Sequence, residues 1–129
     1  ADKHGLELHP TAVRAARRDA RLIDAGIRRN HRANALFLDV LTSRRDPETV
    51  LRWMNEAGVF GRFVPDFGRV VAQSQFDMYH HYTVDEHTIR AIGLLARIES
   101  GAMADEHPIA TQVLRQIVSR RVLYVAVLL

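Results

Sequence analysis

The sequence predicts an all-α fold, and three observations support that prediction. Apolar residues recur at intervals of three and four over most of the 129 residues, which is the spacing of one face of an α-helix. No stretch alternates apolar and polar residues between hairpin turns, as antiparallel strands would. Capping residues, prolines and glycines divide the chain into segments of helical length. With 47% hydrophobic and 26% charged residues, the chain has the composition of one folded unit, so we expect a single helical domain over residues 1–129.

The first third of the chain predicts two amphipathic helices. The first begins at Pro10, which suits the first turn of a helix, and its apolar stripe extends to residue 27. This stripe consists of Val13, Ala16, Ala20, Ile23 and Ile27. Arginines occupy much of the opposite side of this helix. The second helix is predicted to span residues 33–41. Arg44 and Arg45 come after it, where the end of a helix favours positive charge.

A third helix is predicted to begin at Pro47 and to end at Gly58. Asp46 can accept hydrogen bonds from free N–H groups of the first turn, and Pro47 has no N–H to leave unpaired. Gly58 suits the left-handed conformation that often ends a helix. Glycine and proline then interrupt the pattern, and the apolar residues around Phe67 predict a short helix or a helical turn.

The clearest helix start in the chain is the sequence TVDE at residues 83–86. Its spacing is that of a capping box, in which Thr83 and Glu86 each accept a hydrogen bond from the other's backbone N–H. We therefore expect a helix from residue 84 to about residue 99, ended by serine and glycine. Another helix is predicted to begin at Pro108 and to extend through residue 118. Two arginines, Arg120 and Arg121, come next, and the apolar segment 122–129 follows them.

Composition excludes several classes of protein. Because the chain contains no cysteine, it can have no disulfide, no thiolate metal site and no cysteine nucleophile. Its longest apolar run is the eight residues 122–129, against about 20 for a membrane span, and no signal-peptide pattern opens it. We expect a cytoplasmic protein that does not enter a membrane. Since a free apolar end favours aggregation, we also expect this chain to be a piece of a longer protein.

The net charge of +3 comes from the first part of the chain. Residues 1–32 contain eight basic and four acidic residues, so their local net charge is +4. Such a helix can contact another domain, an acidic partner or nucleic acid. The excess charge is small, and we do not expect nucleic acid to be the partner.

Several side chains could carry chemistry, and His87 is the first candidate. Its spacing from three apolar residues predicts that it lies on the inner face of the helix. These residues are Ala91, Leu94 and Ile98. A histidine that points inward can be a hydrogen-bonded core residue or a metal ligand, and spacing alone favours the core residue. By composition alone, His80 and His81 are loop residues.

Two other groups have structural interpretations. The adjacent carboxylates Asp85 and Glu86 lie near a helix start, where negative charge is favourable, so we expect them to act in capping. Four aromatic residues between positions 53 and 67 lack the interleaved basic residues of a base-stacking surface. We expect these four to be core or domain-contact residues: Trp53, Phe60, Phe63 and Phe67.

Two stretches carry a family resemblance. The sequence NEAGVFGRFVPDF at residues 55–67, followed by MYHHYTVDEHTIR at residues 78–90, resembles the central region of the bifunctional PII uridylyltransferase/uridylyl-removing enzymes of bacterial nitrogen control. The resemblance covers essentially the whole chain. That family has an N-terminal nucleotidyltransferase domain, a helical HD-type phosphohydrolase domain and two ACT domains that sense glutamine. The resemblance implies that residues 1–75 are a helical lead-in and residues 76–129 the first part of an HD-type helical bundle, truncated before its His-Asp doublet.

The implied activity is hydrolytic removal of UMP from a uridylylated tyrosine of the PII signalling protein. In the family, a divalent metal, Mg²⁺ or Mn²⁺, is held by an early histidine, a His-Asp doublet and a later aspartate, and it assists phosphodiester hydrolysis. His87 matches the early histidine by its place in DEHTIR. His80 matches a histidine that could orient phosphate or support a ligand, and Arg90 could reach phosphate.

The resemblance also sets what we expect of this fragment. The family's doublet follows an apolar helix like residues 125–129, and this chain lacks it, so we expect the fragment to be inactive and to bind no metal. Expected partners are PII and the nucleotidyltransferase and ACT domains of the parent chain. The alternative is an autonomous helical interaction module that contacts another domain or nucleic acid through the arginine-rich first helix.

Overall fold

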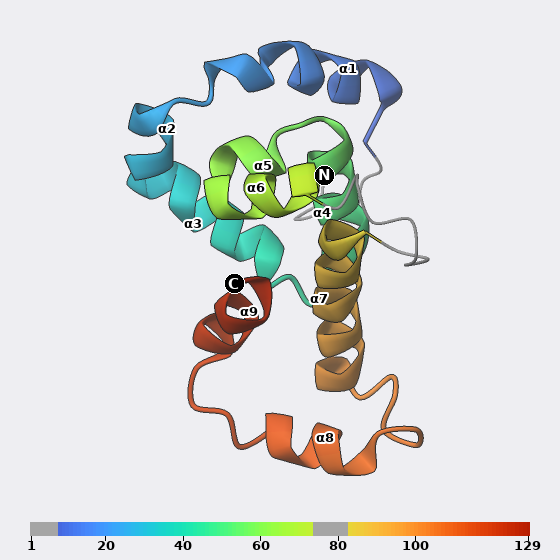
Figure 1. Cartoon of the computed structure of the whole chain (residues 1–129). Coiled ribbons are helices and arrows are strands. Elements are labelled where there is room, and N and C mark those ends of the chain that lie inside the picture. Colours follow the sequence, from blue (N-terminus) through green and yellow to red (C-terminus); the bar gives the residue numbers. More distant parts are fainter. Residues whose placement is uncertain (1–7, 74–82) are drawn as a thin grey trace.

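Helices form most of the chain in the computed structural model, which describes residues 8–73 and 83–129 (Figure 1). The first half contains α1 (Pro10–Asp19), a 3-10 turn η2 (Ala20–Leu22), α2 (Ala25–Arg29), α3 (His31–Leu41), α4 (Pro47–Glu56), α5 (Phe60–Phe63) and α6 (Pro65–Gln73). The second half contains α7 (Val84–Ser100), α8 (Pro108–Leu114) and α9 (Arg120–Leu128). The described residues include no strand, so the all-α prediction is confirmed.

The first predicted helix is interrupted, so the prediction of one helix over residues 10–27 is wrong. Pro10 does open α1, but α1 ends at Asp19 and the chain continues through η2 to an extended residue, Ile23. Asp24 then starts α2, because its Oδ1 accepts a hydrogen bond from the backbone N–H of Ile27 at 2.9 Å. Asp24 thus ends the predicted stripe early, and the side chain of Ile27 is exposed.

Two arginines tie this N-terminal part to the helices beneath it. Arg17 donates to the backbone carbonyl of Glu56, the last residue of α4, at 3.0 Å. Arg28 donates to the carbonyl of Arg62 in α5 at 3.3 Å. Carbonyls at a helix end lack a partner within the helix, so guanidinium groups satisfy them well.

Local signals placed the start and end of α4 correctly. Asp46 Oδ1 accepts a hydrogen bond from the N–H of Thr49 at 3.0 Å, and Pro47 is the first helical residue. Gly58 follows with φ of 70° and ends the helix, as predicted. The predicted short helix around Phe67 is α6.

Phe60 and Phe67 are core residues, as expected. Both are buried, and their rings stack with centroids 3.9 Å apart. Phe37 of α3 contacts both Phe60 and Phe63, at centroid distances of 5.7 and 5.1 Å. Trp53 is half-buried. This cluster joins α3, α5 and α6 into one part of the core.

α7 is the central helix of the described chain, and it contacts α4, α6, α8 and α9 (Figure 1). Its buried residues are Asp85, Ile89, Ile92, Gly93, Ala96 and Ile98. Ile89 and Ile92 belong to a core cluster with Leu41 of α3, Leu51 of α4 and Tyr124 of α9. The core therefore lies where α4 and α9 meet α7, with α3 packed against α4 and α9.

α4 and α7 are in close contact at Gly93. A Cβ atom at this position would lie 2.7 Å from Cβ and 2.9 Å from Cδ of Glu48. Both distances are shorter than a van der Waals contact, and the Cβ of Glu48 cannot move aside by a side-chain rotation. A glycine at position 93 therefore sets the separation of these two helices.

α9 runs antiparallel to α7, because its first turn contacts the last turn of α7. Glu99 of α7 accepts hydrogen bonds from two guanidinium nitrogens of Arg120, one of them at 2.7 Å, and from the hydroxyl of Tyr124 at 2.8 Å. Arg120 also donates to the carbonyl of Thr42, just after α3, at 3.1 Å. The pKa of Glu99 lies below its usual value, chiefly because Arg120 donates to it.

α8 is shorter than predicted, because it ends at Leu114 and does not reach residue 118. Ser119 caps α9 through a hydrogen bond from the N–H of Val122 at 3.4 Å. Residues 115–118 therefore form a connection between α8 and the cap of α9, where the sequence predicted a continuous helix.

We expect Gly93→Ala to reduce the free energy of unfolding by about 1 to 2 kcal/mol. Overpacking at the α4–α7 contact costs more than the roughly 1 kcal/mol that alanine gains over glycine in a helix. Urea unfolding followed by circular dichroism measures this change. Gly26→Ala in the exposed α2 is the matched control: the three nearest atoms to its Cβ would all belong to the side chain of Asp24, with Oδ1 at 3.1 Å. The gain in helix propensity opposes that contact, so this substitution should cost at most about 0.5 kcal/mol. Equal effects at the two glycines would contradict the close contact at Gly93.

We expect Tyr124→Phe to change how stability depends on alkaline pH. Burial raises the pKa of Tyr124 to about 12, whereas an exposed tyrosine titrates near 10. The unfolded chain therefore loses this proton first, so the stabilisation is complete below about pH 10 and is lost as pH rises towards 12.

The difference in unfolding free energy between the native protein and Tyr124→Phe measures this effect, because other titrating groups contribute equally to both. It should be largest near pH 9, where the native protein also keeps the hydrogen bond to Glu99, and should decrease by about 2 kcal/mol by pH 12. A difference that stays constant over that range would show that Tyr124 titrates normally.

Candidate functional site

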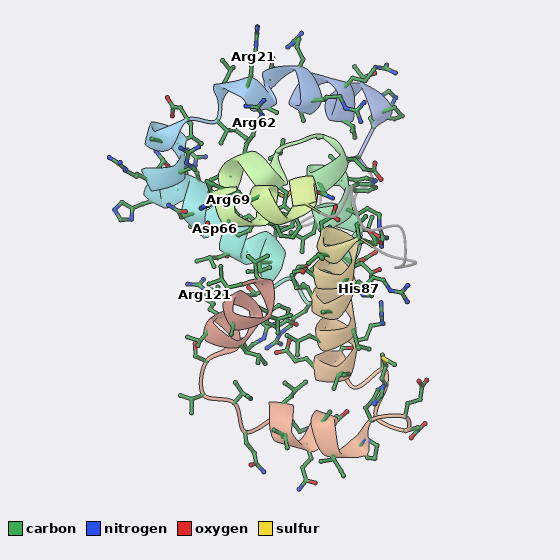
Figure 2. All side chains as sticks on the ribbon, in the orientation of Figure 1. Arg21, Arg62, Asp66, Arg69, His87 and Arg121 are labelled. Carbon is green, nitrogen blue, oxygen red and sulfur yellow. The ribbon has the colours of Figure 1, made fainter. Side chains whose placement is uncertain are left out.

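The side chains of His87 and Arg90 are exposed and lie one turn apart on α7. Figure 2 marks His87 on this helix. The prediction that His87 points inward is therefore wrong. Asp85 and Ile89, each two residues away, are buried. Because two residues turn a helix by about 200°, their side chains lie almost opposite to that of His87. His80 and His81 lie outside the described residues.

The predicted capping box is only half correct. Thr83 is the residue that precedes α7, but its side chain makes no capping hydrogen bond. Glu86 bonds to Arg52 of α4, so its carboxylate does not reach back to Thr83. A charged partner on another helix has displaced a local hydrogen bond, which sequence spacing cannot reveal.

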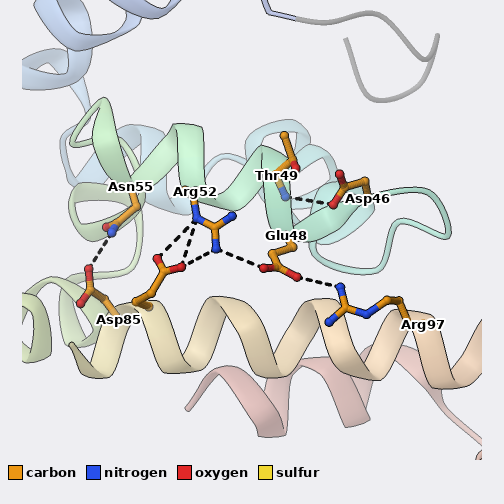
Figure 3. Close-up of polar contacts among 8 residues, drawn as sticks. Asp46, Glu48, Thr49, Arg52, Asn55, Asp85 and Arg97 are labelled. Carbon is orange, nitrogen blue, oxygen red and sulfur yellow. Dashed lines mark hydrogen bonds and ion pairs between the residues drawn. The ribbon is translucent and has the colours of Figure 1, made fainter. Parts of the chain in front are cut away.

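Glu86 belongs to a network of four charged residues that joins α4 to α7 (Figure 3). Arg52 donates from Nε to Glu86 at 3.2 Å and from Nη2 to Glu48 at 3.1 Å. Glu48 also accepts a hydrogen bond from Arg97 at 3.0 Å. Hydrogen bonds from Arg52 to both carboxylates raise its pKa, with Glu86 the larger cause.

Asp85 completes the contact at the beginning of α7. Its Oδ2 accepts a hydrogen bond from the side-chain amide of Asn55 at 2.7 Å (Figure 3). The carboxyl is 8% exposed, and its Oδ1 has no hydrogen-bond partner in the part of the chain that the structure describes. We expected Asp85 to act in capping, and the structure instead buries it against α4.

The described residues do not form a metal site by themselves. No group of three histidine, aspartate or glutamate side chains in residues 8–73 and 83–129 is close enough to hold one ion. The divalent metal that the family resemblance implies therefore has one candidate ligand among them, His87.

Within residues 8–73 and 83–129, no helix is both long and apolar enough to cross a membrane.

A family model described as "Uridylyltransferase GlnD third domain" matches residues 1–63, which end with α5. The bifunctional uridylyltransferase/uridylyl-removing enzyme of Novosphingobium aromaticivorans is 77% identical over 124 residues, or 96% of this chain. The chain belongs to the bifunctional uridylyltransferase/uridylyl-removing enzyme family.

Two further members of the uridylyltransferase/uridylyl-removing family match the whole chain. The enzyme of Erythrobacter litoralis is 63% identical and that of Azospirillum brasilense 55% identical, each over 129 residues. The chain spans 14% of the length of these relatives. No solved structure matches it.

The family match extends well past the residues that the family model covers. α6 to α9 follow residue 63, and they include the central helix and the DEHTIR sequence at residues 85–90. The sequence alone was enough to relate this region to the uridylyl-removing family. It did not predict the charged network between α4 and α7. The only signal for it was the opposite charge of residues 48 and 52, one helical turn apart.

We expect Arg52→Gln to lower the free energy of unfolding by about 1 kcal/mol, because two half-buried carboxylates lose their charged donor. Arg69→Gln is the matched control. Arg69 pairs with Asp66 on the open surface, where both side chains are more than 70% exposed, so its loss should cost less than about 0.5 kcal/mol. Thermal unfolding of both variants tests this difference. A larger loss for Arg69→Gln would contradict the role given to the network.

Proposed function

We propose that this chain is part of an enzyme that transfers UMP to the PII signalling protein and removes it again, and that the chain contributes to removal. The identity of 77% over 96% of the chain to an enzyme named for both activities carries the proposal. That identity includes the central helix. Residues 1–75 would be a helical lead-in, and residues 76–129 the first part of an HD-type phosphohydrolase domain.

His87 is the residue that we propose as a metal ligand in the whole enzyme. Its exposure on α7 supports this role, since a ligand must be accessible to groups from other parts of the protein. The antiparallel packing supports it too: α9 starts beside Glu99, so its C-terminal end lies towards the half of α7 that carries His87 (Figure 1). The other ligands, and the choice of Mg²⁺ or Mn²⁺, would come from outside the described residues.

Two further residues have proposed supporting roles. Arg90 lies one turn after His87 on the same exposed side, so a phosphate held near His87 would be within reach of a guanidinium group. His80, outside the described residues, is proposed to orient phosphate or to support a ligand.

The alternative of an autonomous interaction module has less support. Arg17 and Arg28, both in the arginine-rich N-terminal part, donate to backbone carbonyls of this same chain. Part of the positive charge is therefore used to hold the N-terminal helices in place. The proposed partners remain PII and, within the parent chain, the nucleotidyltransferase and ACT domains.

The test is His87→Ala in the complete enzyme. We expect removal of UMP from modified PII to fall by orders of magnitude, because a metal site that loses a ligand loses its catalytic ion. Transfer of UMP to PII should continue, since another domain would carry it out. Both activities and the melting temperature are measured on the same preparation.

His31→Ala, at the exposed start of α3, is the control for loss of an imidazole and should leave both activities unchanged. The melting temperature of His87→Ala should stay close to that of the native enzyme, because alanine has the higher helix propensity. A variant that removes UMP at a near-native rate would show that His87 is not a ligand. Loss of both activities together would indicate a structural role instead.

A further inference from the structure

A cavity of about 420 Å³ lies at the opposite end of α7 from His87. The last turns of α7, the end of α8 and the start of α9 surround it, and Arg44, from the segment after α3, completes its wall. Its volume falls within the range of small-molecule sites, about 300 to 1,000 Å³. Nothing in the proposed removal of UMP uses this cavity.

The walls of the cavity carry an excess of positive charge. Three arginines and one glutamate line it, so its formal net charge is +2. Glu99 is fully engaged, because it accepts hydrogen bonds from two nitrogens of Arg120 and from the hydroxyl of Tyr124. The charges of Glu99 and Arg120 therefore cancel, and the excess belongs to Arg44 and Arg115.

Arg44 and Arg115 come from separate segments, and neither guanidinium makes a hydrogen bond or an ion pair within the described residues. Arg44 is near enough to Glu99 to help lower the pKa of that carboxyl, but the hydrogen bonds of Glu99 go to Arg120 and Tyr124. Both arginine side chains are exposed. Arg115 follows the C-terminal end of α8, whose partial negative charge attracts it, but that partial charge is smaller than the formal charge of an arginine. Arg44 lies three residues after the end of α3, and the partial negative charge at that helix end acts only within its last turn.

The remainder of the lining is largely apolar. Ala96, Leu114 and Ile117 provide carbon surface next to the two free guanidinium groups. An inorganic anion would leave this surface in contact with water. A ligand with an anionic group and an apolar body would cover it and would still reach the arginines.

We propose that this cavity binds a small organic phosphate, with Arg44 and Arg115 as the phosphate-binding residues. A guanidinium presents two parallel N–H donors that match two phosphate oxygens, and a phosphate dianion matches the excess charge of +2. Glu99 and Tyr124 act as positioning residues, since they hold Arg120 in the wall. The site is separate from the proposed metal ligand His87.

Phenyl phosphate is a suitable probe, and hydrogen exchange measured by mass spectrometry on the complete protein is a suitable readout. This method reports each peptide separately, so other phosphate sites of the parent enzyme do not interfere. We expect phenyl phosphate to slow exchange in peptides that cover residues 42–46 and 112–121. Inorganic phosphate should do so more weakly, and phenol should have no effect at the same concentration.

The double variant Arg44→Gln with Arg115→Gln should weaken this protection at least roughly tenfold in ligand concentration, since both charge-assisted contacts are lost. Arg29→Gln is the matched control, because it removes an exposed arginine of α2 that does not line the cavity. The proposal is overturned if millimolar phenyl phosphate gives no protection, if phenol protects equally, or if the double variant is protected like the native protein. Equal protection by benzoate would assign the cavity to carboxylates instead.

Discussion

The close contact between α4 and α7 at Gly93 is the constraint on which the rest of the structure depends. With no side chain at this position, α4 lies near enough to α7 for Glu48 to occupy the space above it. That contact decides which side of α7 is buried, and Ile89 and Ile92 follow it into the core. His87 faces solvent for the same reason, because it lies on the side that α4 does not cover.

Arginine has a larger part in this fold than the composition suggests. Seventeen of the eighteen basic residues are arginine, which from the sequence alone could be a surface bias. Arg17 and Arg28 satisfy carbonyls at helix ends. Arg52 joins Glu48 of its own helix to Glu86 of α7, and Arg120 bridges two partners from other segments. A guanidinium has five donors in a fixed plane, so one side chain can join three elements, as Arg120 joins α9 to α7 and to the end of α3.

The two ends of α7 are chemically distinct. His87 and Arg90 lie near its start, and Glu99, beside the basic cavity, lies near its end. Twelve residues of helix separate positions 87 and 99, which is roughly 18 Å along the axis. This separation means that a ligand at one end does not contact the other, so each can be tested without disturbing its counterpart.

Signals that act within a few residues of one another determined the all-α class and most helix boundaries from the sequence alone. Asp46 and Pro47 start α4, and Gly58 ends it, because capping and backbone conformation depend on immediate neighbours. The break after Asp19 and the early end of α8 also have local signals, because Asp24 and Ser119 each start a new helix. Tertiary structure decided the pairing of Glu86 with Arg52 and the outward direction of His87. Both depend on α4, a segment distant in the sequence, so periodicity along one helix could indicate the residue types of a site but not the side on which they lie.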